Sequence, residues 1–488
     1  MEQLPVGQML PRKALDWIWL MVGMILAVFL GQFIAKGGLR DSIMLVALVF
    51  VLAWVFLSRQ AWWIFLPPFV LFGGVVHIGF KIYFHEIALT LALVAFLPVF
   101  AMKTPIQRKL PRYAWLLISF LFIHWATSIV INRMSGLSGT GNIIRVYMQA
   151  AWPLIFMVPF YCFGIATRFQ KTVLLLMYFT AVLRVSIALV SHFFPYGITF
   201  LPFASFVLSG PLAGMSDLRF SGLQLVMLTI CYFHLSRRLM SKIFHFLILA
   251  TAVVLVLMGS GRVAVGMLFL ILPLWAILYR KFILAAGVSI ALAAGVLTLN
   301  AKPNLIYSFP YPMQRALCVL VMKKVDIDWH GRVEASDEWH RQLTKLAYER
   351  WTRSVPSFLL GNHIEGFDDS FYRAGIGMEV RAQIAARIAA YESGLWTVLG
   401  SIGLAGLILY LLLFWFLLKD VARELLKARI HSYTHTFYFL AVLMLILWIA
   451  FSWIAGGFPS LELFMAVIAK VMYEENRKSS VIPSEPAT

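Results

Sequence analysis

The sequence predicts an all-α integral membrane protein with about 12–14 transmembrane helices and one large, partly helical loop before its last spans. Of the 488 residues, 61% are hydrophobic and only 13% are charged, whereas soluble domains are nearer half apolar and a quarter charged. The mean hydropathy is +0.85. Long apolar runs also recur between short polar breaks, at the length that a membrane-spanning helix requires. These observations exclude a water-soluble enzyme and a disordered chain.

The apolar runs divide the chain into four parts. About eleven spans are expected within residues 1–299, a loop over 300–394, further spans over 395–473, and a disordered cytoplasmic tail over 474–488. The runs do not alternate apolar and polar residues, as the strands of a membrane β-barrel would. We predict spans near residues 14–35, 42–58, 61–80, 83–102, 113–132, 144–166, 172–193, 221–236, 242–258, 262–278, 282–299, 395–418, 436–455 and 459–473.

Basic residues are concentrated in every second short loop, which predicts the orientation of the chain. With a cytoplasmic N-terminus, the loop over 300–394 faces outward. This bias accounts for much of the formal net charge of +19, so the charge does not indicate a nucleic-acid partner. The loops assigned to the cytoplasm carry Arg59, Lys103, Arg108, Lys109, Arg112, Arg168, Lys171, Arg237, Arg238, Lys242, Arg280, Lys281, Lys419, Arg423, Lys427 and Arg429.

The outward loop reads as a folded segment because its acidic and basic residues are nearly balanced. Residues 334–352 have helical spacing, with Trp339, Leu343 and Ala347 on one side. Leu360-Gly361-Asn362 predicts a turn. A second helix is predicted over about 376–393, running into the next span.

Three arginines lie where a membrane protein rarely tolerates charge. Arg184 falls in the outer half of one predicted span, while Arg219 and Arg262 stand at the outer starts of two others. Guanidinium groups match phosphate oxygens, and a helix start offers free N–H groups to a phosphate. Gly259 and Gly261 would let the backbone approach such a ligand closely. We therefore expect one outward-facing anion site.

Simpler explanations exist for each of these arginines. Arg184 could pair with a carboxylate on another helix. Arg219 and Arg262 could extend to the lipid headgroups instead.

Other chemistries have little support, and we expect no metal and no cofactor. Asp326, Asp328 and His330 are metal-ligating types, but their spacing fits no strong motif. The three cysteines are far apart, which excludes a disulfide framework or a thiolate cluster. Phosphate-loop, dinucleotide-binding, zinc-protease and serine-hydrolase motifs are absent from the sequence.

Several short motifs, in order, resemble the O-antigen ligase and O-antigen polymerase superfamily of bacterial membrane glycosyltransferases. Arg219-Phe-Ser-Gly222 is similar to the family's Arg-x-x-Gly element, and Gly261-Arg262 to its Ser-Arg element. Gly331-Arg332, followed by Trp339 and the segment 356–361, is similar to the family's loop pattern. Many spans followed by one large outer loop is also the family's layout.

The resemblance implies a GT-C-like fold and a metal-independent transfer of glycan on the outer face of the bacterial inner membrane. The donor would be an undecaprenyl-pyrophosphate-linked glycan, and the acceptor a sugar or the lipid A core. The loop over 300–394 would then be periplasmic. Arg184, Arg219, Arg262 and Arg332 would bind the pyrophosphate, and Arg262 would also assist catalysis.

One departure from the family concerns the residue that would take the proton of the acceptor hydroxyl. Glu392-Ser393 stands before Gly403 and Gly406 at the spacing at which the family has His-Asn before Gly-x-x-Gly. In the family that histidine is thought to activate the acceptor hydroxyl. A carboxylate can do the same work where partial burial makes it more basic, so we expect Glu392 to be the base. Alternatively, Glu392 lies on a solvated helix face, and His363 or His340 supplies the base.

The functional alternatives differ in class. Ligase and polymerase differ only in the acceptor, which the sequence does not reveal. A transporter or flippase of lipid-linked oligosaccharide would also use intramembrane arginines, but it predicts internal repeats and broken helices that this sequence lacks. A structural role without catalysis is a further alternative, because Glu392 stands where the family has the histidine that is thought to act as base.

Overall fold

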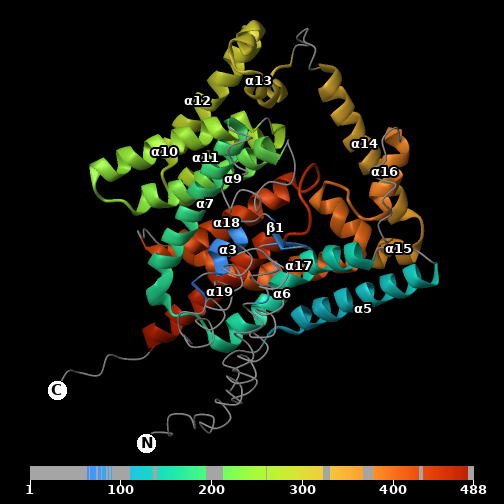
Figure 1. The fold of residues 1–488 in the computed structure, drawn as a ribbon. Coiled ribbons are helices and arrows are strands. Elements are labelled where there is room, and N and C mark those ends of the chain that lie inside the picture. Colours follow the sequence, from blue (N-terminus) through green and yellow to red (C-terminus); the bar gives the residue numbers. More distant parts are fainter. Residues whose placement is uncertain are drawn as a thin grey trace, which may run out of the picture.

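The computed structural model describes residues 63–64, 66–72, 75–78, 80–83, 86, 90, 110–135, 140–193, 213–259, 261–322, 330–365, 377–427 and 432–481. The spans predicted over 14–35 and 42–58, and most of 83–102, lie outside these residues. The described chain is almost entirely helical (Figure 1).

The long helices before the outer loop are α5 (Arg112–Met134), α6 (Thr140–Phe163), α7 (Gln170–Phe193), α9 (Ala213–Leu235), α10 (Leu239–Met258), α11 (Arg262–Leu278) and α12 (Phe282–Ala301). Those after it are α17 (Gly394–Lys427), α18 (Tyr433–Phe451) and α19 (Ser460–Val481). Each predicted span from residue 113 onward falls on one of these helices. Seven helices of the described part are long and apolar enough to cross a membrane, which identifies the chain as a helical membrane protein.

The span predicted over residues 61–80 is wrong. This segment contains a short helix, α3 (Leu66–Phe72), followed by an antiparallel hairpin of β1 (Val75–Ile78) and β2 (Phe80–Tyr83). Pro67 and Pro68 are tolerated only in the first turn of a helix, and Gly73-Gly74 follows its last residue in the sequence. A single long helix through this segment is therefore disfavoured. Without this crossing, the count of spans no longer predicts a cytoplasmic N-terminus together with an outward-facing loop over 300–394.

Two further boundaries differ from the predictions. The helix predicted over 376–393 is α16 (Met378–Arg387), and a turn with left-handed backbone at Ala389 and Glu392 separates it from α17. The tail predicted from residue 474 is helical as far as Val481, as part of α19. Lys470 pairs with Glu474 one turn later, which supports this extension.

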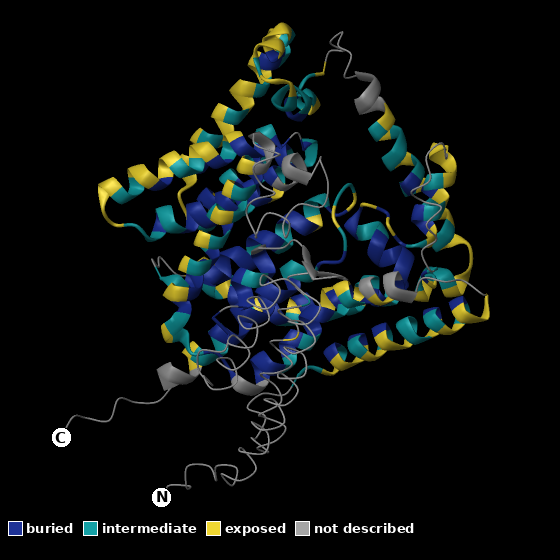
Figure 2. Cartoon of the chain, in the orientation of Figure 1, coloured by how far each residue is buried: buried dark blue, intermediate teal, exposed yellow. Residues whose placement is uncertain are grey.

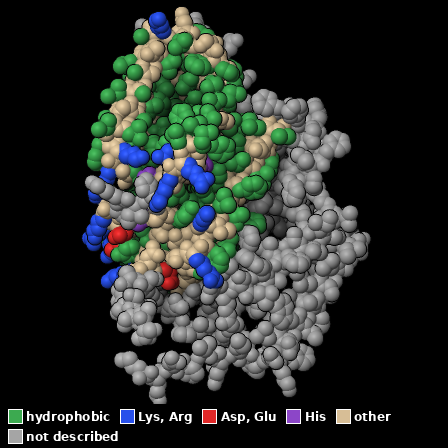
Figure 3. All heavy atoms as spheres, turned by 90° about the vertical axis from the view of Figure 1, so that its left-hand side faces the viewer, with side chains coloured by type: hydrophobic (Ala, Val, Ile, Leu, Met, Phe, Trp, Pro, Cys, Tyr) green, Lys and Arg blue, Asp and Glu red, His purple; other side chains and the backbone are tan. Residues whose placement is uncertain are grey.

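The core lies where α17, α18 and α19 pack together with α6 (Figure 2). Phe437 and Phe464 are completely buried there. In contrast, α12 carries exposed apolar side chains such as Phe282 and Ile290 along its length. Apolar side chains cover much of the face seen in Figure 3, with a group of lysines and arginines among them. Such a surface suits a chain that is surrounded by lipid.

The described part of the loop over 300–394 folds into a cap, by which we mean the 3-10 helix Pro303–Ser308, α13 (Tyr311–Leu317), the 3-10 turn Cys318–Leu320, α14 (His330–Thr352), α15 (Val355–Leu360) and α16. The predicted face of α14 is buried at Leu343 and Ala347 and partly buried at Trp339, and Leu343 packs against Ala382 and Ala385 of α16. In Figure 1, α14, α15 and α16 lie together at the right of the bundle.

The cap is fixed to the bundle at a break in α17. The backbone of Gly403 has φ 64° and ψ −170°, so the helix is interrupted there. The expectation that the chain has no broken helices is therefore wrong for this span. Gly361, at φ +82°, lies directly against this break, and Asn362 donates its N–H to the Gly400 carbonyl at 2.9 Å. Asn132 of α5 adds a side-chain hydrogen bond to the Ile364 carbonyl at 2.8 Å. Gly400 and Gly403 are therefore the part of α17 that the cap contacts, through Asn362 and Gly361.

Candidate functional site

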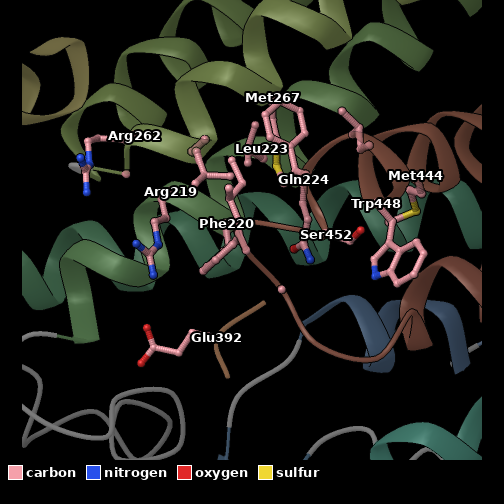
Figure 4. Close-up of a pocket in the computed structure, with 18 of the residues that line it drawn as sticks. Arg219, Phe220, Leu223, Gln224, Arg262, Met267, Glu392, Met444, Trp448 and Ser452 are labelled. Atoms are coloured by element: carbon pink, nitrogen blue, oxygen red, sulfur yellow. The ribbon is translucent and has the colours of Figure 1, made fainter. Parts of the chain in front are cut away.

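A pocket of about 640 Å³ lies between the cap and the bundle. Helices α9, α11, α18 and α19, the cap helices α13 and α14, and the turn before α17 all contribute to its lining. In the close-up, Arg219, Arg262 and Glu392 lie at the left of the view and Met444 and Trp448 at the right (Figure 4). The pocket thus has one charged end and one mainly apolar end.

Arg219 reaches the pocket because two glycines make room for it. It lies in the second turn of α9, against the turn that joins α10 to α11. A Cβ atom on Gly259 would lie 2.5 Å from the Arg219 backbone nitrogen, and one on Gly261 would lie 2.7 Å from Arg219 Cδ. We expected these glycines to admit a ligand, but the group they admit is the arginine itself. The Arg219 guanidinium carbon lies 4.6 Å from the centre of the Phe220 ring.

Arg262 is the first residue of α11, directly after the N-cap residue Gly261. Among the described residues no side chain caps this helix start, so its first N–H groups and the positive end of its dipole are available to an anion. Its guanidinium pairs with Asp337 of α14, at 2.5 Å between Nη2 and Oδ1. This pair joins the bundle to the cap at the charged end of the pocket.

Arg315 of α13 is a third arginine in the lining, and our reading of the sequence missed it. Its neighbour Cys318 reports on the local charge. Burial raises the pKa of the Cys318 thiol, the positive charge of Arg262 lowers it, the Asp337 carboxylate raises it, and Arg315 lowers it. The Cys318 thiol therefore lies within electrostatic reach of both arginines and of Asp337.

Glu392 and His340 face each other at the rim. Glu392 comes from the turn before α17 and His340 from α14, and the distance between Glu392 Oε2 and His340 Nδ1 is 3.9 Å. Glu392 has φ 57°, which is unusual for a residue with a side chain. Such conformations persist where the surrounding structure holds them in place, and they are often found at functional sites.

The opposite end of the pocket is mainly apolar. Met444 of α18 lies there (Figure 4), and Met227 of α9, Met267 of α11, and Leu447 and Phe451 of α18 are further apolar members of the lining. Methionine side chains adapt to irregular apolar ligands, so this wall suits a flexible hydrocarbon chain. Gln224, Ser452 and Glu462 are polar members of the same lining.

The remaining predicted site residues are placed differently. Arg184 is not in the pocket lining; it donates from Nη1 to the Leu71 carbonyl of α3 at 3.3 Å. Arg332 is in the first turn of α14, but its side chain lies outside the described part of the structure. His363 is exposed and is not in the lining. The structure thus brings Arg219, Arg262 and Glu392 together and leaves Arg184 apart.

Within the residues that the structure describes, no group of three or more His, Cys, Asp or Glu side chains is arranged to hold a metal ion. Positive charge at the pocket comes from arginines and from the start of α11. Comparison of the chain with family models, with curated proteins and with solved structures gives no match.

Proposed function

We propose that this protein is a membrane glycosyltransferase of the O-antigen ligase or polymerase type. It transfers a glycan from an undecaprenyl-pyrophosphate donor to an acceptor sugar. The observation that carries the proposal is a single pocket in which Arg219, Arg262 and Arg315 meet Glu392 and His340 at one end of an apolar wall. A lipid pyrophosphate has this same division, with two phosphates on one side and a hydrocarbon chain on the other.

The chemistry that we assign to the charged end is displacement at the anomeric carbon. The acceptor hydroxyl oxygen bonds to that carbon, and the bond from the carbon to the pyrophosphate oxygen breaks with its electron pair left on the leaving group. Arg219 and Arg262 stabilise the negative charge that grows on the pyrophosphate. We assign the removal of the acceptor proton to the rim of the same pocket, where Glu392 and His340 lie.

The position of the pocket along the helices supports an outward-facing site. It lies at the N-terminal ends of α9 and α11 and beneath the cap. The clusters Arg237-Arg238 and Arg280-Lys281 follow the opposite ends of these two helices. Basic residues mark the cytoplasmic side of membrane proteins, so we assign the pocket and the cap to the periplasmic face of the bacterial inner membrane.

The test is to replace Arg262 and Glu392 separately by alanine and to score the length of the surface polysaccharide on gels. We expect shortened or missing polymer in both variants, together with accumulation of the lipid-linked intermediate. Arg341→Ala is a matched control, because this arginine lies on α14 with its side chain 74% exposed. Unchanged polymer in both pocket variants would refute the assignment.

A further inference from the structure

The exposure of Glu392 bears on which side chain takes the proton. A carboxylate is normally too weak a base for this work near neutral pH, and it becomes effective where burial disfavours its charged form. The Glu392 side chain is 54% exposed, so its own position at the rim does not provide that burial. Imidazole, in contrast, is matched to neutral pH without burial. His340 lines the same rim.

The geometry gives the two groups different roles. Glu392 Oε2 approaches the Nδ1 atom of His340, which leaves the opposite ring nitrogen, Nε2, for another partner. A carboxylate beside Nδ1 favours the tautomer that carries its proton there, so Nε2 becomes the proton acceptor. The separation of 3.9 Å is longer than a hydrogen bond. Catalytic hydrogen bonds are often long without substrate and shorten when substrate binds.

Both partners are held by their surroundings. The turn that carries Glu392 is fixed on α18 and the residues after it, because Ser393 Oγ donates to the Ser452 carbonyl at 2.7 Å and Gly394 N–H to the Ala455 carbonyl at 3.1 Å. His340 is one helical turn after Asp337, which is paired to Arg262. The ion pair that joins cap and bundle therefore also places the imidazole near the arginines.

We propose that His340 is the catalytic base of this transferase and that Glu392 is a positioning residue that orients it. This inference rests on the proposed function. His340 Nε2 takes the proton of the acceptor hydroxyl as the oxygen forms its bond to the anomeric carbon. The pyrophosphate leaves with the electron pair of the broken bond. The histidine thus comes from the cap helix α14 and not from the turn before α17.

The first experiment reads the tautomer and does not depend on activity. Full-length protein with ¹⁵N-labelled histidine rings is placed in lipid nanodiscs, and the His340 signals are assigned by their loss in His340→Gln. Neutral His340 should be mainly the Nδ1–H form in the native protein, and this preference should be lost in Glu392→Ala. A tautomer that is unaffected by the replacement would overturn the positioning role.

The second experiment measures transfer from the undecaprenyl-pyrophosphate-linked saccharide purified from producing cells. His340→Ala should lower kcat by about 100-fold or more, with partial rescue by added imidazole. Glu392→Ala should lower kcat less with little change in KM, Glu392→Asp should recover part of the rate, and the double variant should be no worse than His340→Ala. A larger loss in Glu392→Ala than in His340→Ala would overturn the assignment. Absence of transfer by the native protein would instead refute the proposed function.

Discussion

The side chain of Arg219 packs against Gly261, so closely that a methyl group on the glycine would lie 2.7 Å from Arg219 Cδ. The backbone of Arg219 also lies directly against Gly259. The turn between α10 and α11 is therefore shaped to admit Arg219 beside Arg262. Two guanidinium groups from different helices reach one pocket because Gly259 and Gly261 have no side chain to block Arg219.

This relationship predicts a loss of function from a very small change. Gly261→Ala should displace the Arg219 side chain and lower transfer by about 10- to 100-fold, because small misplacements of a catalytic group are costly. Gly287→Ala is the matched control, since nothing lies within 4 Å of a Cβ atom there. Polysaccharide length and thermal stability should be measured for both variants. Equal activity of the two variants would contradict the role given to Gly261.

The arginines should differ in their contribution to the reaction. Arg219→Ala and Arg262→Ala should each lower transfer by about 100- to 1,000-fold, the usual effect of removing one donor to a developing anion. Arg184→Ala should have a much smaller effect, because Arg184 contacts α3 and is not in the pocket lining. Rates are to be compared at equal amounts of folded protein in the membrane. A loss in Arg184→Ala as large as in Arg262→Ala would be inconsistent with this pocket.

Cys318 provides a chemical probe of the charge on Arg262. The thiolate is the reactive form, and burial raises the pKa of the Cys318 thiol while Arg262 opposes this rise. Alkylation of Cys318 by a maleimide should therefore keep rising with pH above the range where an exposed thiol reaches its plateau. At a fixed pH it should be slower in Arg262→Gln, because loss of the positive charge disfavours the thiolate. Cys318→Ser gives the background, and faster labelling in Arg262→Gln would argue against this effect of Arg262.

A separate prediction concerns stability on the far side of the bundle. Lys470 of α19 is buried, and its Nζ atom lies 2.8 Å from Asp420 of α17 and 3.6 Å from Glu474. Lys470→Met leaves these carboxylates without their cation and should lower the free energy of unfolding by about 1–3 kcal/mol. Lys345→Met is the control, because that lysine is exposed and its pair with Glu349, at 3.9 Å, should contribute almost nothing. Equal thermal unfolding of the two variants would contradict the prediction.

The long helices of the described part were predictable because length and hydropathy alone determine whether a segment can span a membrane. The span predicted over 242–258 coincides with α10. The cap was predictable from a different pattern. Helical spacing in residues 334–352 predicted α14 and the side of it that packs inward. Pro67-Pro68 and Gly73-Gly74 indicated a break before β1, but the apolar content of the segment masked it.

The candidate site was only partly predictable. Arg219 and Arg262 stand out because charge at the start of a span is conspicuous. Arg315 and His340 lie in a polar loop where such residues are ordinary, and only the packing of the cap brings them to the pocket. Arg184 is equally conspicuous in the sequence, but α7 places it elsewhere. A residue pattern along one helix does not determine which helix faces a neighbour, so convergence on one site requires the tertiary structure.

The pyrophosphate site is tested most directly by equilibrium binding of undecaprenyl pyrophosphate to the purified chain in nanodiscs. Native protein should bind it at least about tenfold more tightly than undecaprenyl phosphate, because guanidinium groups on two helices can each contact phosphate oxygens. Arg219→Ala/Arg262→Ala should remove this preference, while Arg341→Ala retains it. Equal binding of the two lipids by the native protein, or an unchanged preference in the double variant, would contradict the account.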